Sequence, residues 1–233
     1  MPIFTKRKKS NEGDLWFKKS YSQSGEDLIV KFIFDSLNIS HPSYIDIGAH
    51  HPYYLSNTAI FYELGCRGMN IEADPNLFTS FQQHRMQDEN LNIGISTKKG
   101  FADFYIISTP TLNTFSKLDA ERYQEEGDYH ITEIIKIPTD SINNIIDAYY
   151  GGVFPNFLNV DAEGIDELII RSIDYDKSYP LVICVETLSF SSTGKGIKNT
   201  TVTDYLIQKG YMIYADTNIN TILVKRKLWE RVD

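Results

Sequence analysis

The chain has 233 residues, of which 42% are hydrophobic and 13% aromatic, and its formal net charge is -8. That length fits one large domain or two small ones, and the composition can bury a substantial core, which excludes a disordered chain. Non-specific binding to nucleic acid is not expected, because it depends on an excess of Lys and Arg contacts to phosphate.

The first twenty residues depart from this acidic balance. They contain the run KRKK at residues 6–9 and the pair Lys18 and Lys19. We interpret residues 1–20 as a basic, flexible segment, and the alternative is docking to a partner or to an anionic membrane surface. No apolar stretch follows the basic run as in a signal peptide, and none reaches the ~20 residues of a membrane span. We therefore expect a cytoplasmic protein.

The two cysteines give no sign of a metal or redox motif. Cys66 and Cys184 lie far apart in the sequence, and neither belongs to a CxxC pair. Such an isolated pair does not indicate a zinc site or a secreted disulfide framework. Cys184 sits in the apolar run PLVICVE, where we expect a small core residue.

Helical and extended patterns alternate from residue 24 onward. The first helix is predicted over SGEDLIVKFIFDSL, where Ser24 and Asp27 have the spacing of a capping box. Its apolar face would comprise Leu28, Ile29, Phe32, Ile33 and Leu37. Further helices are predicted over residues 56–64, 75–85, 141–150, 165–173 and 201–210. Strands are predicted at 44–48, 68–74, 91–96, 100–108, 131–140, 156–161 and 179–186, with a hairpin over 211–227.

Buried strands that alternate with amphipathic helices predict an α/β fold with a mostly parallel sheet covered on both faces. The hairpin over 211–227, turning at Asn218–Asn220, adds antiparallel pairing at one edge. We therefore expect the Rossmann-like architecture of class I methyltransferases, with seven strands in one domain over residues 21–233. The polar connection between the strands at 100–108 and 131–140 is long enough to be functional or mobile.

Acidic and polar residues follow four of the predicted parallel strands. They are Asp46, Gly48, Ala49 and His50; Glu72, Ala73 and Asp74; Asp161, Ala162 and Glu163; and Glu186 and Thr187. Ligands of open α/β sheets bind beyond the carboxyl ends of the strands, so these residues form the candidate site. Clustered carboxylates also repel one another and need donors or cations nearby.

The turn after the first strand indicates a cofactor without phosphate. An acid at the end of the second strand, here Glu72, commonly accepts the ribose hydroxyls of a nucleotide. A dinucleotide also needs a glycine-rich turn for its pyrophosphate, but DIGAHHP has only Gly48. S-adenosylmethionine has a ribose, an adenine and a charged amino-acid end, and no phosphate, so it fits this pattern.

Several motifs together resemble a known family. They are YSQSGED at 21–27, IDIGAHHP at 45–52, SNT at 56–58 and GMNIEADP at 68–75, followed by NIGIS, FLNVDAEGIDELI and PLVICVE. In this combination and order, over roughly residues 21–186, the chain resembles the FkbM-type S-adenosylmethionine-dependent methyltransferases. The resemblance implies an O-methyltransferase of the kind that often acts on sugar hydroxyls of polysaccharides, glycolipids and glycosylated natural products.

The resemblance also implies roles for individual residues around the cofactor. Asp46, Gly48 and His50, with Ala49 in the same turn, would line the methionine end, and Glu72 beside Ala73 would hold the ribose. Asn92 and Ile93 would contact adenine, and Asp161 would approach the amino group or the reacting methyl. Gln23 is a hypothesised lid contact, and Asn57 a further cofactor contact. The structural alternatives are an ordinary turn at Gly48, a strand-terminal polar residue at Asn92 and a helix cap around Gln23.

Methyl transfer to a sugar hydroxyl calls for a general base. The candidates are His50, His51, Asp161, Glu163 and Glu186, and we favour Asp161 or Glu163, assisted by Glu186. The alternative is a divalent metal on Asp161 and Glu186, which is not favoured because the sequence shows no clear third ligand. Zinc on the paired histidines is not expected, since adjacent side chains usually point in different directions.

The acceptor would enter over the connection STPTLNTFSKLDAERY. Thr111, Asn113, Thr114 and Tyr123 offer hydroxyl, amide and aromatic contacts that suit a glycan, although a plain flexible loop is the alternative. The sequence therefore predicts an S-adenosylmethionine-dependent O-methyltransferase for a sugar of a cell-envelope polysaccharide or glycolipid. A non-sugar acceptor and a non-catalytic scaffold with the same fold remain the two alternatives.

Overall fold

The computed structural model of the chain describes residues 16–189 and 196–231. The basic run at 6–9 lies outside these ranges, so the division into residues 1–20 and one domain over 21–233 stays a prediction. Within the described ranges, none of the helices combines the length and the apolar character that crossing a bilayer requires.

The main sheet has seven strands in the order β3-β2-β1-β7-β8-β10-β9. They span Tyr44–Ile47 (β1), Gly68–Ile71 (β2), Glu89–Leu91 (β3), Phe157–Val160 (β7), Val182–Glu186 (β8), Tyr211–Asp216 (β9) and Asn220–Lys225 (β10). The first five named strands pair in parallel, while β10 is antiparallel to both β8 and β9. This confirms the predicted fold class, including the antiparallel hairpin.

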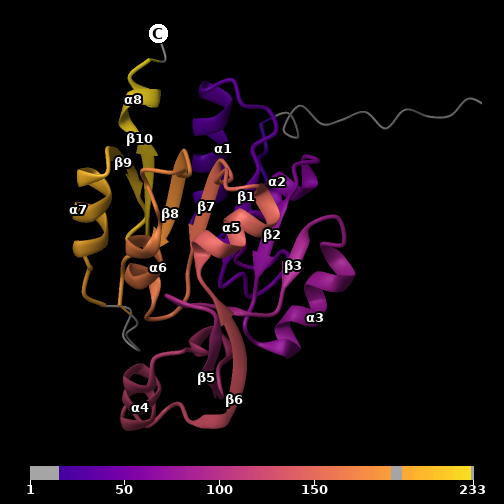
Figure 1. Cartoon of the computed structure of the whole chain (residues 1–233), viewed down its shortest axis with the longest axis vertical. Coiled ribbons are helices and arrows are strands. Elements are labelled where there is room, and N and C mark those ends of the chain that lie inside the picture. The colour runs from indigo at the N-terminus through magenta and orange to yellow at the C-terminus, as the bar shows by residue number, and fades with distance from the viewer. Residues whose placement is uncertain (1–15, 190–195, 232–233) are drawn as a thin grey trace, which may run out of the picture.

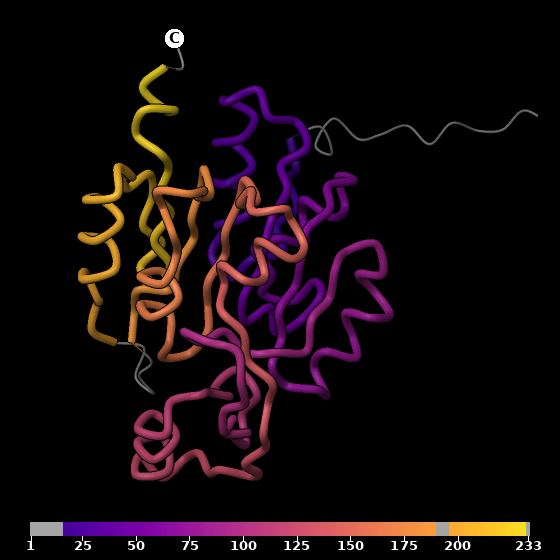
Figure 2. The backbone as a smooth tube through the Cα atoms, in the orientation of Figure 1, coloured from indigo at the N-terminus to yellow at the C-terminus, as the bar shows by residue number. Residues whose placement is uncertain are grey.

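Helices cover both faces of this sheet (Figure 1, Figure 2). They span Glu26–Ser36 (α1), Ala59–Glu63 (α2), Pro75–His84 (α3), Ile142–Tyr150 (α5), Asp166–Ser172 (α6), Thr201–Gln208 (α7) and Arg226–Trp229 (α8). Helices α1 and α2 share one apolar cluster with strand residues such as Tyr44 and Phe157. Helices α5, α6 and α7 share the other with their strand neighbours, Ile45 and Leu158. Successive strand residues thus point to opposite faces.

The first helix differs from the prediction at Phe32 and at its cap. Ile33 is buried, and Leu28, Ile29 and Leu37 pack against the same apolar cluster, as predicted. Phe32 is instead 56% exposed, and Val30 and Phe34 are buried where the helix packs on α2 and β10. The predicted capping box is absent: the Ser22 hydroxyl accepts the amides of Gly25 (3.0 Å) and Asp27 (3.4 Å) in place of Ser24.

A second, three-stranded sheet lies at the carboxyl ends of the main strands (Figure 1). We call residues 94–140 the lobe. It contains β4 (Gly94–Ile95), β5 (Gly100–Ile107), a 3-10 turn (Pro110–Leu112), α4 (Lys117–Glu125) and β6 (Ile131–Asp140). The single strand predicted at 91–96 is therefore wrong. The chain leaves the main sheet after Leu91, and Gly94 begins a strand that pairs with β6.

Candidate active site

A cavity of about 570 Å³ lies between the carboxyl ends of the main strands and the lobe. Its lining includes fourteen of the predicted site residues: Gln23, Asp46, Gly48, Ala49, His50, Asn57, Glu72, Ala73, Ile93, Thr111, Asn113, Asp161, Glu163 and Glu186. The lobe adds an apolar wall of Phe104, Leu112 and Phe115. A cavity of this size, apolar with a few convergent polar groups, is the usual form of a small-molecule site.

The turn after β1 requires glycine at position 48. Gly48 has φ +74°, a left-handed conformation, and a Cβ there would overlap the carbonyl oxygen of Asp161. Its amide donates to the carbonyl of Ile71 (3.0 Å), as does the amide of Ala49 (3.2 Å). The turn therefore packs directly between the ends of β2 and β7.

The Glu72 carboxylate is held in place by backbone donors. One oxygen accepts the amide of His50 and the other accepts the amide of Asp74, both at 2.7 Å. Burial raises the pKa of Glu72 to about 7, and the two amide bonds oppose that rise. Because each carboxylate oxygen has a second lone pair, both can still accept a hydroxyl from the cavity.

A chain of buried polar side chains ends at Asn57. Asp46 accepts hydrogen bonds from the hydroxyl of Thr58 (2.6 Å) and from the amide nitrogen of Asn159 (2.8 Å). The Asn159 oxygen in turn accepts the amide nitrogen of Asn57 (2.9 Å). The Asn57 Oδ1 is buried and accepts no hydrogen bond from the described residues, and Asn57 itself lines the cavity.

Three carboxylates converge at the ends of β7 and β8. One oxygen each from Asp161, Glu163 and Glu186 lies within 4.8 Å of the others. Burial raises the pKa of Asp161 to about 7, and burial together with the neighbouring carboxylates raises the pKa values of Glu163 and Glu186. Such a group can take a proton near neutral pH or hold a divalent cation, for which Glu163 supplies the third oxygen that the sequence did not reveal.

The two histidines have different environments. His50 is half-buried in the cavity wall, and burial and then the charge of His51 lower the pKa of His50. His51 Nδ1 instead accepts the amides of Tyr53 (3.1 Å) and Tyr54 (2.9 Å). His51 thus holds the loop that leads to α2.

The segment before α1 packs against the C-terminal hairpin. Glu26 is fully buried and accepts hydrogen bonds from Thr217 (2.7 Å), Asn220 (3.1 Å) and the amide of Ser24 (2.8 Å). These contacts hold the segment over the cavity, which Gln23 and Asn220 both line. Asn220 was missed by sequence reasoning because its neighbourhood reads only as a hairpin turn.

Three predicted site residues do not line the cavity, which corrects their predicted direct contacts. The side-chain amide of Asn92 donates to the backbone carbonyls of Glu72 (2.8 Å) and Ala73 (2.9 Å). Asn92 therefore holds the backbone at the end of β2. Thr114 donates to the carbonyl of Glu163 (2.6 Å). Tyr123 is buried in the lobe's own apolar cluster, so its ring is not available for stacking on a sugar.

Residues 46–213 match the model of the methyltransferase FkbM domain. A methyltransferase FkbM from Methylobacillus flagellatus KT has 16% identity and a TM-score of 0.47, over 79% of this chain and 44% of that one. This chain thus spans less than half the length of that protein.

Two other solved structures have lower TM-scores. A TehB-like SAM-dependent methyltransferase from Corynebacterium glutamicum has 9% identity and a TM-score of 0.43, over 86% and 87% of the two chains. The Burkholderia thailandensis 1,6-didemethyltoxoflavin-N1-methyltransferase, solved with S-adenosylhomocysteine, has 8% identity and a TM-score of 0.38, over 89% and 91%. No curated protein matched the sequence.

Proposed function

Because this chain belongs to the FkbM methyltransferase family, we propose that it transfers a methyl group from S-adenosylmethionine to a hydroxyl of a sugar in a cell-envelope polysaccharide or glycolipid. The proposal rests on one observation: a nucleotide-type acidic residue and a cluster of carboxylates line the same cavity. Glu72 offers free lone pairs at the end of β2, and the three carboxylates lie at the ends of β7 and β8.

The residues at the cavity fit the cofactor group by group. Glu72 would accept the ribose hydroxyls, and the narrow turn at Gly48 leaves no glycine-rich loop for a pyrophosphate. The unpaired Asn57 oxygen would accept a donor from the amino-acid end. Ile93 and Leu77 line the cavity on the β2–β3 side, where an adenine ring would pack. The bound cofactor supplies a methyl group activated by a sulfonium.

The chain's own task in the reaction is then alignment and proton removal. The acceptor oxygen must approach in line at about 3 Å from the methyl carbon. Its proton would pass to Asp161 or Glu163, and the raised pKa of Asp161, about 7, is well matched to a general base at neutral pH. Sharing of protons among the three carboxylates would keep one of them able to accept.

A polyhydroxylated acceptor suits this end of the cavity. Carboxylates that repel one another are stabilised by hydroxyl donors, and a sugar offers several in one ring. Thr111 and Asn113 add polar groups on the lobe side, although the Asn113 amide already donates to Asp74 (2.8 Å). The same three carboxylates also provide the oxygen ligands that Mg²⁺ prefers. A chelator distinguishes a bound cation from a general base.

The testing experiment combines calorimetry with labelled methyl transfer. We expect the protein to bind S-adenosylmethionine and to label a member of a panel of nucleotide sugars, glycolipids and envelope glycans. If only a non-sugar hydroxyl compound is labelled, the proposed methyl transfer to a hydroxyl stands and the proposed sugar acceptor is wrong. Absence of cofactor binding at millimolar concentration would leave only a scaffold role.

Two further arms of the experiment address the carboxylates. Asp161→Asn should keep the fold and reduce turnover by about 100-fold or more, because it removes the base. Near-normal turnover would show that Asp161 is not the general base. Activity that survives EDTA supports the base, whereas loss restored by added Mg²⁺ supports a metal on the same three carboxylates.

A further inference from the structure

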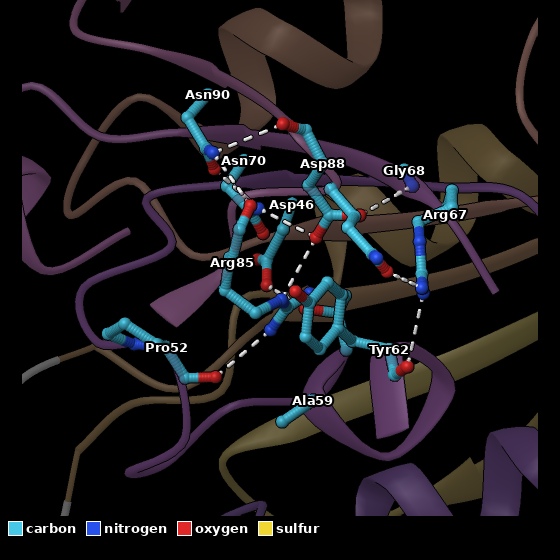
Figure 3. Close-up of polar contacts among 12 residues, drawn as sticks. Asp46, Pro52, Ala59, Tyr62, Arg67, Gly68, Asn70, Arg85, Asp88 and Asn90 are labelled. Carbon is cyan, nitrogen blue, oxygen red and sulfur yellow. Dashed lines mark hydrogen bonds and ion pairs between the residues drawn. The ribbon is translucent and has the colours of Figure 1, made fainter. Parts of the chain in front are cut away.

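Arg85 is completely buried, and it lies outside the cavity at the end of α3. Its Nε donates to Asp88 (2.9 Å), its Nη1 to the carbonyl of Pro52 (3.0 Å), and its Nη2 to the hydroxyls of Tyr44 (2.8 Å) and Thr58 (3.4 Å). Figure 3 shows the guanidinium between Pro52 and Asp88, with Asp46 beside it. One side chain thus joins α3 to the loop that carries the cofactor turn into α2.

The contact of Arg85 with Thr58 begins a hydrogen-bond chain whose direction agrees with the accepting Asp46 carboxylate. Arginine can only donate, so the Thr58 oxygen accepts from Arg85 and its proton goes to Asp46 (2.6 Å). The second Asp46 oxygen accepts from Asn159, whose amide nitrogen must therefore face it (2.8 Å). The Asn159 oxygen then faces Asn57.

Asn57 is the end of this chain. Because the Asn159 oxygen can only accept, Asn57 turns its amide nitrogen toward Asn159 (2.9 Å) and keeps its own oxygen free. That oxygen is buried without a partner among the described residues, and Asn57 lines the cavity. Burial raises the pKa of Asp46, and the hydrogen bonds from Thr58 and Asn159, followed by the charge of Arg85, oppose that rise.

The position of Asn57 relative to the sheet indicates which ligand group it meets. Asn57 contacts Asn159 of β7 and approaches the sulfur of Cys184 in β8 (3.7 Å). Glu72 lies on the other side of β1, at the end of β2. A ligand whose ribose is on Glu72 therefore extends its remaining end across β1 toward Asn57. For S-adenosylmethionine that end carries an ammonium group, which donates hydrogen bonds.

We propose that Arg85 is a positioning residue that acts through Thr58, Asp46 and Asn159 to present the Asn57 oxygen to the ammonium group of the cofactor. This inference rests on the proposed function, because it takes S-adenosylmethionine as the ligand. It adds a residue with no cavity contact to the binding machinery, and it assigns a hydrogen-bond direction to each member of the chain.

The test compares two ligands that differ in the amino-acid end. S-adenosylhomocysteine has the ammonium group, and 5′-methylthioadenosine lacks the whole amino-acid part. Thr58→Val, which removes the hydroxyl between Arg85 and Asp46 at nearly constant volume, should raise the Kd for S-adenosylhomocysteine about 10-fold or more. The Kd for 5′-methylthioadenosine should change less than twofold. Thr58→Ser should restore the binding of S-adenosylhomocysteine.

Tyr44→Phe is the matched control. It removes a hydroxyl that contacts Arg85 and Asp88 in the same buried cluster, and it leaves the contacts of Thr58 with Arg85 and Asp46 in place. We expect a lower melting temperature and unchanged Kd values for both ligands. If Thr58→Val does not fold, Asn159→Ala breaks the same chain one step later and is measured in its place.

The outcomes separate this inference from the function on which it rests. Unchanged binding of S-adenosylhomocysteine by the Thr58→Val and Asn159→Ala variants would overturn the inference alone. An equal loss for both ligands would also overturn it, because the chain would then only support the fold. A wild-type protein that binds neither ligand would overturn the proposed function, and with it the role of Arg85.

Discussion

Glu72 shows how one side chain links the stability of the protein to the pH of its surroundings. Its carboxylate is buried with two backbone amides as donors, and burial raises its pKa to about 7 from an ordinary value of 4.5. A raised carboxyl pKa means that the folded state binds the proton more tightly than the unfolded state. The contribution of Glu72 to stability is therefore complete below about pH 4.5 and is lost as the pH rises through 7.

We therefore expect Glu72→Gln to change the pH dependence of stability in the ligand-free protein. Between pH 5 and pH 8 the free energy of unfolding of the variant should rise by about 2–3 kcal/mol relative to that of the wild type, since glutamine cannot ionise. Urea denaturation of both proteins at several pH values measures this difference. Glu89→Gln, at an exposed position, is the control, and parallel curves for Glu72→Gln and the wild type would contradict the prediction.

The turns that follow β1 and α2 offer a comparison at the scale of elements. Gly48 and Gly65 both have left-handed backbones, with φ of +74° and +87°. A Cβ at Gly65 would meet no atom within 4 Å, whereas one at Gly48 would overlap the Asp161 carbonyl. A side chain at either position would thus strain the backbone, but only a side chain at Gly48 would also clash with a neighbouring atom.

Alanine at the two glycines should therefore give different results. Gly65→Ala should lower the free energy of unfolding by about 1–2 kcal/mol, the cost of a left-handed alanine, and leave binding of S-adenosylhomocysteine unchanged. Gly48→Ala should destabilise the protein more and weaken binding strongly, because the turn must move away from Asp161. Denaturation and calorimetry on both variants test this, and equal effects would show that the close packing at Gly48 is unimportant.

Most elements of the fold follow from local pattern, and the exceptions have identifiable causes. Sequence patterns predict the four buried residues of β1 and the start of α3, which has an Asp cap followed by proline. They do not predict the split of the strand expected at 91–96, because the split depends on the pairing of Gly94 and Ile95 with Thr139 and Asp140, more than forty residues along the chain. Phe32 is apolar but exposed, and periodicity alone assigned it to the buried face.

The candidate site divides in the same way. Residues directly after strands, such as Glu72 and Asp161, were predicted because parallel strands end at one edge of the sheet. Asn159 and Arg85 were not, because their contacts depend on strand register and on a long-range approach. Asp46 meets Asn159 only because β1 and β7 pair with these two residues side by side. A polar residue inside the apolar strand FLNV was the one available signal.

At the scale of the whole molecule, the cavity lies between two sheets that are joined by apolar packing, such as Ala73 against Phe104 and Ile137, and by hydrogen bonds. Asn113 of the lobe donates to Asp74 after β2 (2.8 Å), and Thr114 donates to the Glu163 carbonyl after β7 (2.6 Å). Residues of both sheets line the cavity. A ligand that fills it should therefore stabilise both at once.

Hydrogen exchange can test this coupling. At 100 times its Kd, S-adenosylhomocysteine should raise the free energy of unfolding by about 2.7 kcal/mol. Amide protection should increase at the β1 turn and also over 104–115 of the lobe, while α8, at the opposite end of the molecule, should change little (Figure 1). Protection confined to the main sheet would mean that the ligand does not reach the lobe.

The lobe is one uninterrupted stretch of chain. It leaves the main sheet after β3 and returns through α5 to β7. The turn at Gly48, Glu72 and Arg85 lie before it in the sequence, and Asn159 lies after it. Under the proposed function, cofactor capture and the lobe wall of the acceptor pocket are therefore encoded in separate segments. Replacement of residues 94–140 by the corresponding segment of another family member is then a direct way to exchange acceptor preference while the methyl donor site stays intact.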